Sequence, residues 1–148
     1  MVDLNKYLGK WNEIASFPAR FQEECSQVQA EYIDKGNYIS VKNSCVINGK
    51  KKEIKGKAFK TDESNRLKVQ FFWPFRSDYI IEHVDKEYQV AIVGSGNKNY
   101  LWILARNKSI DKELFEKLIK IARKKGYDVS RLKIARNRVR KKELKDEI

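Results

Sequence analysis

The sequence predicts an all-β protein: an eight-stranded antiparallel up-and-down β-barrel, with one C-terminal α-helix packed outside it and a short final strand. Three observations predict this fold. Short β-prone runs follow one another with turn residues between them, apolar and polar residues alternate within the runs, and only one later segment has helical spacing. An eight-stranded barrel is wide enough to be filled by its own side chains or to hold one small ligand.

Eight strands are predicted, and seven of them follow in immediate succession with short links, which is the pattern of a meander. Turn residues such as Asn48-Gly49 mark the links, and Trp73-Pro74 interrupts a run because proline cannot donate to a β-ladder. The alternation of Leu67, Val69 and Phe71 with lysine and glutamine predicts one buried and one solvated face. The predicted strands span residues 11–17, 28–34, 38–47, 53–60, 66–72, 78–86, 88–93 and 100–106.

A single helix follows the strands. Ser109 is the predicted N-cap, apolar residues recur at helical spacing from Ile110 to Ala122, and Gly126 ends the helix. A final strand is expected over residues 129–135. The tail 137–148 is nearly all charged, and we expect it to be exposed to solvent. Residues 1–136 are therefore predicted to form one domain, followed by a charged tail.

Composition and charge narrow the class of protein. The chain has 148 residues, and a hydrophobic fraction of 41% is too high for a disordered chain. Lys and Arg outnumber Asp and Glu by 32 to 20, a net charge of +12 that attracts polyanions and anionic surfaces at low salt. No apolar run is long enough to span a membrane, and residues 1–20 lack the apolar core of a signal peptide. We therefore expect either a cytosolic chain or one whose targeting segment has been removed.

Three short segments resemble the sequence motifs of the lipocalin family, in the same order and at similar spacing: Gly9-Lys10-Trp11, Asp85-Lys86-Glu87-Tyr88, and the run from Tyr100 to Arg106. Together with residues 71–75 and 126–130, they are similar to the bacterial lipocalin branch related to apolipoprotein D, over residues 3 to about 136. The resemblance implies that Trp11 closes the barrel floor and that Arg106 lies across its indole as a cation–π contact. It implies structural roles for these two residues and for Gly9, Asp85 and Tyr88.

The motif positions fix which side chains are expected to face the interior. The predicted set mixes large apolar groups with glycine and alanine, and its tyrosines and histidine offer polar contacts, as in many ligand pockets. The predicted ligand-binding residues are Ala30, Tyr32, Ile39, Val41, Ile54, Gly56, Ala58, Leu67, Val69, Phe71, Tyr79, Ile81, His83, Val90, Ile92, Tyr100, Trp102 and Leu104.

Cys25 and Cys45 are the only cysteines. A hairpin turning near residues 35–37 places Gln27 opposite Cys45, which leaves Cys25 close enough to bond it. Such a disulfide would stabilise the fold by roughly 3 kcal/mol in the chain-entropy model. We expect this bond in an exported domain, with two inert thiols as the alternative.

Nothing in the sequence indicates catalysis, a cofactor or a metal site. Phosphate-binding loops, nucleophile motifs and clusters with metal-ligand spacing are missing, and His83 is expected to be a polar cavity contact. An isomerase or epoxidase-like lipocalin is the enzymatic alternative. It would need an acidic residue inside the barrel, and Glu13 is the only candidate.

The family resemblance implies that the protein binds, transports or stores a small hydrophobic ligand, such as a fatty acid or a lysophospholipid. A basic rim of Arg20, Lys57, Lys60 and Arg76 would favour an anionic head group. The alternatives are a module that uses its charge to bind polyanions or an anionic membrane surface, and a barrel whose interior is full. We expect no specific nucleic acid, a monomer or weak homodimer, and, from the resemblance, a periplasmic or outer-membrane location, with extracellular and cytosolic locations left open.

Overall fold

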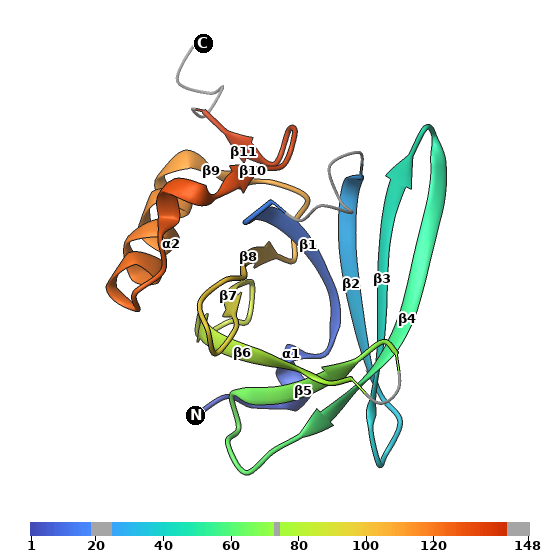
Figure 1. Ribbon diagram of the computed structural model, residues 1–148. Coiled ribbons are helices and arrows are strands. Elements are labelled where there is room, and N and C mark those ends of the chain that lie inside the picture. Colours follow the sequence, from blue (N-terminus) through green and yellow to red (C-terminus); the bar gives the residue numbers. More distant parts are fainter. Residues whose placement is uncertain (19–24, 73–74, 142–148) are drawn as a thin grey trace.

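Eight strands, β1 to β8, form an antiparallel sheet that closes on itself where β1 pairs with β8 (Figure 1). The computed structural model describes residues 1–18, 25–72 and 75–141. A short helix precedes the barrel, and a longer helix with short strands follows it. The elements are α1 (Leu4–Tyr7), β1 (Gly9–Ser16), β2 (Ser26–Asp34), β3 (Ile39–Ile47), β4 (Lys50–Lys60), β5 (Arg66–Gln70), β6 (Ser77–Val84), β7 (Val90–Gly94), β8 (Leu101–Ala105), β9 (Ile110–Asp111), α2 (Lys112–Lys124), the 3₁₀ turn η1 (Val129–Arg131), β10 (Lys133–Ile134) and β11 (Val139–Arg140). The predicted fold class is confirmed.

The strand β1 changes partners along its length. It pairs with β2 from Gly9 to Asn12, and with β8 from Asn12 to Ser16. The short strand β10 pairs with β1 at Ala15 and Ser16. In this part of β1, one edge pairs with β8, and β10 pairs with the other edge, which β2 no longer occupies. The barrel wall therefore opens between β1 and β2 beyond Asn12.

Two separate apolar cores result from this arrangement. One fills the closed end of the barrel around Trp11, Tyr32 and Leu67. The other lies between the outer barrel wall and α2, whose buried residues Phe115, Leu118 and Ala122 share one helical face. Figure 1 shows α2 lying beside β6, β7 and β8, on the side of the barrel away from β2, β3 and β4.

The C-terminal region differs from the prediction in two places. The N-cap of α2 is Asp111, whose Oδ1 accepts from the Leu114 amide at 2.8 Å, because Ile110 and Asp111 are held in strand β9 by parallel pairing with β11. The expected strand 129–135 is reduced to β10, since Asp128 caps η1 by accepting from the Ser130 amide.

The start of the charged tail is also not free in solvent. Arg138 is 6% exposed, and its Nη1 donates to the Lys108 carbonyl at 2.8 Å. Residues 142–148 lie outside the described residues. Of the described helices, none has the length and apolar character needed to cross a membrane.

A disulfide joins Cys25, just before β2, to Cys45 on β3, with the two Cα atoms 5.4 Å apart. The two strands pair across this region with a register shift between Ser26 and Gln29, where Gln27 has a positive φ of 52°. This irregularity brings Cys25 to Cys45, so the bond forms where the sequence predicted it.

Candidate functional site

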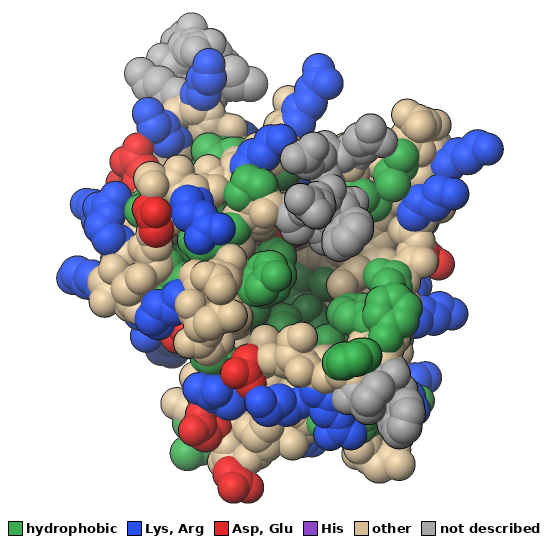
Figure 2. Space-filling model, in the orientation of Figure 1, with side chains coloured by type: hydrophobic (Ala, Val, Ile, Leu, Met, Phe, Trp, Pro, Cys, Tyr) green, Lys and Arg blue, Asp and Glu red, His purple; other side chains and the backbone are tan. Residues whose placement is uncertain are grey.

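A cavity of about 730 Å³ lies inside the barrel, within the size range of small-molecule sites. Its lining includes Phe72, Phe75 and Tyr100 from near the strand ends on one side, so the cavity opens at the end of the barrel where β1, β3, β5 and β7 end. Figure 2 shows this hollow near the centre of the molecule, lined by hydrophobic side chains.

The structure brings ten of the predicted interior residues to the cavity wall. They come from six strands and from the segments that border them, and most are apolar or aromatic. They are Ala30, Tyr32, Val41, Ile54, Val69, Phe71, Tyr79, Tyr100, Trp102 and Leu104.

Other predicted interior residues face inward but lie below the cavity. Ile39, Ala58, Leu67 and Ile81 belong to the core that fills the closed end of the barrel. Alternation shows whether a side chain faces inward or outward, but not how far along the barrel it lies. The sequence therefore could not distinguish residues of the closed-end core from residues that line the cavity. Gly56 was expected to leave space, yet the Phe71 ring occupies it: a Cβ at Gly56 would lie 2.7 Å from Phe71 Cδ1.

Three predicted residues do not face the cavity. Val90 and Ile92 pack in the core between the barrel and α2. Every residue of β7 is buried, so apolarity could not show which parity points inward, and Val93 lines the cavity instead. His83 lies beyond a register shift between Ile81 and His83, which turns it to a separate hollow near the N-terminus.

The basic rim is not formed as expected. The Lys57 ammonium lies 4.7 Å from the Tyr38 ring centroid, and the Arg76 guanidinium lies 3.9 Å from that of Phe59. Lys60 ends β4 at the closed end of the barrel, and Arg20 lies outside the described residues. Among the described residues, none of these cations lines the cavity.

Several cavity residues escaped the sequence analysis. Asn43 continues the inward parity of Val41 and could have been found by it. Residues near the mouth had no alternation to reveal them, because turns and irregular strand ends place them. The missed lining residues are Gln29, Asn43, Phe72, Phe75, Ser77, Asp78, Val93, Ser95, Gly96 and Asn97.

The closed end is sealed by Trp11 and Arg106. Trp11 has no exposed surface, and its Nε1 donates to the Tyr7 carbonyl at 2.8 Å. The Arg106 guanidinium lies 3.7 Å from the indole centroid, a cation–π distance. It also donates to the carbonyls of Lys10 and Tyr88. These contacts agree with the plug that the motifs implied.

The other motif residues shape the turn that supports this plug. Asp85 Oδ1 accepts from the amides of Gln89 and Val90 at 2.7 and 2.8 Å. Tyr88 has a positive φ of 57°, and this tight turn aims its carbonyl at Arg106. Gly9 has a φ of +100°, and a Cβ there would lie 3.3 Å from Arg106 Nη1. Glycine is favoured at Gly9 by both its conformation and its neighbour.

Glu13 is an acidic side chain in the cavity wall, 9% exposed. Burial raises the pKa of its carboxyl to about 7, although a hydrogen bond with Ser16 and the charge of Arg138 act in the opposite direction. The carboxyl is therefore partly protonated near neutral pH, and it becomes anionic as the pH rises above 7.

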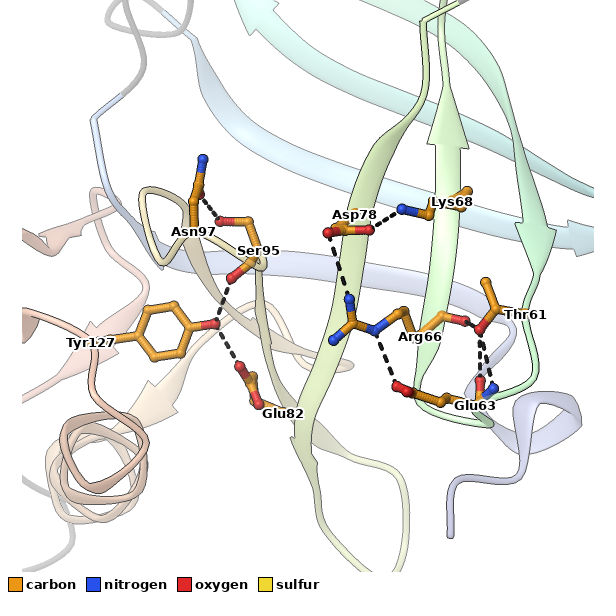
Figure 3. Close-up of polar contacts among 9 residues, drawn as sticks. All are labelled: Thr61, Glu63, Arg66, Lys68, Asp78, Glu82, Ser95, Asn97 and Tyr127. Atoms are coloured by element: carbon orange, nitrogen blue, oxygen red, sulfur yellow. Dashed lines mark hydrogen bonds and ion pairs between the residues drawn. The ribbon is translucent and has the colours of Figure 1, made fainter.

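The mouth carries a second acidic group that is held by cations (Figure 3). Asp78 contacts Lys68 Nζ at 2.5 Å and Arg66 Nη1 at 3.6 Å, and the hydrogen bond from Lys68 lowers the pKa of the Asp78 carboxyl. Gly96 packs against Asp78, since a Cβ there would lie 2.8 Å from Asp78 Oδ2. This charge is thus compensated on the barrel wall.

The mouth is also tied to the helical region. Tyr127 Oη donates to Glu82 Oε2 at 2.6 Å and lies 3.3 Å from the Ser95 carbonyl, and Ser95 Oγ donates to Asn97 Oδ1 (Figure 3). A Cβ at Gly94 would overlap Tyr127 Oη, so only glycine leaves room for this contact. The turn between β7 and β8 is therefore fixed relative to the segment after α2. Within the described part of the chain, no group of three metal-ligating side chains is found.

Comparison with known proteins agrees with this geometry. Residues 2–137 match the family model of the lipocalin-like domain. The chain is 38% identical over 136 residues to the outer membrane lipoprotein Blc of Vibrio cholerae, covering 88% of this chain and 80% of Blc. It is 36% identical over 143 residues to temperature-induced lipocalin-1 of Arabidopsis thaliana, covering 88% and 77%. Insecticyanin of the tobacco hornworm, at 20% identity, has the same fold, with a TM-score of 0.73 over 90% of this chain and 80% of insecticyanin.

A closed barrel with a plugged floor and an apolar cavity is the architecture of barrels that enclose a ligand cavity. This chain belongs to the lipocalin family. The family resemblance of its motifs is thereby confirmed, and lipocalins bind small hydrophobic ligands.

Proposed function

We propose that this protein carries or stores a lipid-like molecule, of the fatty acid or lysophospholipid class, inside the barrel. The observation that carries the proposal is the cavity of about 730 Å³, which is lined mostly by apolar side chains and opens at one end. Burial of an acyl chain there gains roughly 0.8 kcal/mol for each CH₂ group. One open end lets a polar head group stay in water while the chain is enclosed.

We propose binding without catalysis. A lipocalin-type enzyme would need an acidic residue inside the barrel, and Glu13 is such a residue. Asp78, the other acidic residue in the lining, is held by Lys68 and Arg66. In the described part of the lining there is also no histidine or cysteine to serve as a second acid or base.

The proposal is tested by extracting small molecules from purified protein and identifying them by mass spectrometry. We expect a lipid to co-purify at up to one molecule per chain, and to be lost when the protein is unfolded and washed. Recovery of nucleic acid alone, removed by salt, would instead support a module that binds polyanions.

A second role is favoured by the exposed aromatic residues at the mouth. Phe72 and Phe75 are 70% and 76% exposed, and Tyr100 is 50% exposed. Exposed apolar side chains in such a patch mark an interaction surface. The chain has a net charge of +12, and exposed lysines from Lys50 to Lys52 begin β4 at the same end of the barrel. We propose that the mouth touches an anionic bilayer, from which the ligand is loaded.

Sedimentation with vesicles tests this contact. Burial of one phenylalanine side chain contributes about 1.5–3 kcal/mol, so Phe72→Asp with Phe75→Asp should weaken binding to vesicles containing phosphatidylglycerol more than tenfold. Ile33→Asp is the matched control, because Ile33 is 44% exposed near the closed end of the barrel. Equal loss in the control, or no loss in the double variant, would contradict a contact through the mouth.

We also propose a periplasmic or outer-membrane location. The description of Blc as an outer membrane lipoprotein supports it. So does the disulfide between Cys25 and Cys45, since such bonds persist in oxidising compartments.

A further inference from the structure

Three phenol groups meet at the floor of the cavity. Tyr7 comes from α1, Tyr32 from β2 and Tyr79 from β6. Tyr7 Oη lies 2.5 Å from Tyr79 Oη, and Tyr79 Oη donates to Tyr32 Oη at 2.9 Å. Tyr32 and Tyr79 line the cavity, whereas Tyr7 is 1% exposed and lies behind them. The hydroxyls therefore form a chain that starts in the core and ends at the cavity.

Counting the hydroxyl hydrogens shows which tyrosine donates and which accepts in this series of hydrogen bonds. A phenol has one hydroxyl hydrogen, and that of Tyr79 is used toward Tyr32. Tyr7 must then be the donor in its contact with Tyr79. The Tyr32 hydroxyl hydrogen remains, and no acceptor for it is found within the part of the chain that the structure describes. Because Tyr32 is the last acceptor in this series and lines the cavity, this hydrogen is available to a bound molecule.

The phenols keep their hydrogens at physiological pH. Burial raises the pKa of Tyr32 to about 12, and it raises the pKa values of Tyr7 and Tyr79 well above their ordinary value. Each donor in such a chain polarises the next, which strengthens the last hydroxyl as a donor.

The surroundings of this donor favour an uncharged acceptor. Val41, Val93 and Leu104 form the apolar wall beside it, and they would not solvate a carboxylate. The Arg106 guanidinium lies over Trp11 and donates to backbone carbonyls, including that of Tyr7. A neutral carbonyl oxygen is matched to one hydroxyl donor, and a plain alkyl end would leave that donor unpaired.

We propose that the preferred ligand carries a neutral carbonyl oxygen at its leading end, as in a long-chain ketone, an aldehyde or a protonated carboxyl group, and that the Tyr32 hydroxyl donates to it. This inference rests on the proposed function. It adds to that function a chemical selection at the deep end of the cavity.

The test compares 2-tridecanone with tridecane, which have the same chain length and differ in one carbonyl oxygen. Each displaces a neutral fluorescent probe from the wild-type protein and from Tyr32→Phe, and the ratio of the two Kd values is the readout. A neutral hydrogen bond corresponds to a change of about 2- to 12-fold, so the preference for the ketone should fall by that factor in Tyr32→Phe. Tyr38→Phe is the matched control, since Tyr38 does not line the cavity and the loss of its hydroxyl should leave the ratio unchanged.

A second measurement needs no variant. The carbonyl stretching frequency of ¹³C-labelled 2-tridecanone bound to the wild-type protein should lie below its value in hexane, as hydrogen bonding requires. A ratio that is the same in Tyr32→Phe and wild type, or a bound frequency equal to that in hexane, would overturn the inference. Should Tyr32→Phe not fold, the frequency alone decides. If the probe, the ketone and the alkane all fail to bind the wild-type protein, the proposed function itself is wrong.

Discussion

Replacing Trp11 with alanine should lower the free energy of unfolding by about 3–5 kcal/mol, the usual cost of emptying a buried aromatic site. Trp11 is fully buried in the barrel core, and its Nε1 hydrogen bond to the Tyr7 carbonyl holds α1 against the barrel. The Arg106 guanidinium, stacked on the indole, would lose its support and be left over a cavity. The effect thus reaches the plug at the floor of the barrel as well as the packing around it.

Urea unfolding, followed by far-UV circular dichroism, measures this loss. Trp102→Ala is a suitable control, because Trp102 lines the cavity and is only partly buried, so less packing is removed. We expect Trp11→Ala to be clearly the more destabilised variant. Equal stability of Trp11→Ala and the wild-type protein would show that the indole does not hold the floor together.

Strand positions could be predicted from the sequence because turns and proline leave local signals. Asn48 and Gly49, for example, both adopt positive φ in the link between β3 and β4. The inward parity was correct for Val69 and Phe71, which lie on either side of the polar Gln70.

The predicted inward or outward direction of a side chain was wrong, or could not be decided, where a strand departs from simple alternation of apolar and polar residues. In β7 all residues are buried, so Val90 and Ile92 carried no sign of their outward direction. A register shift turned His83 away from the interior. The N-cap at Asp111 depends on the pairing of β9 with β11, which brings together residues about 30 positions apart and leaves no local signal.

The second large effect concerns the cavity. Ala30→Trp should abolish ligand binding, because Ala30 on β2 lines the cavity and an indole there would fill space that the acyl chain needs. Its neighbours across the sheet are Trp11 and Asn43, so the new ring would point into the lower part of the hollow. Overpacking costs typically about 1–3 kcal/mol, which a domain of this size withstands. Ala58 is a poorer site for this test, since it is fully buried in the core below the cavity.

Titration of an environment-sensitive fluorescent fatty acid into Ala30→Trp, and into the double variant Lys55→Glu with Lys57→Glu, tests the central claim most directly. The two lysines are exposed on β4 and do not line the cavity. At about 0.15 M salt, long-range attraction by surface charge is largely screened. Carriage inside the barrel predicts that Ala30→Trp eliminates the saturable signal, while the charge reversals change it only modestly. Normal binding by a folded Ala30→Trp, with loss of binding in the lysine variant, would place the ligand on the basic surface and contradict the account.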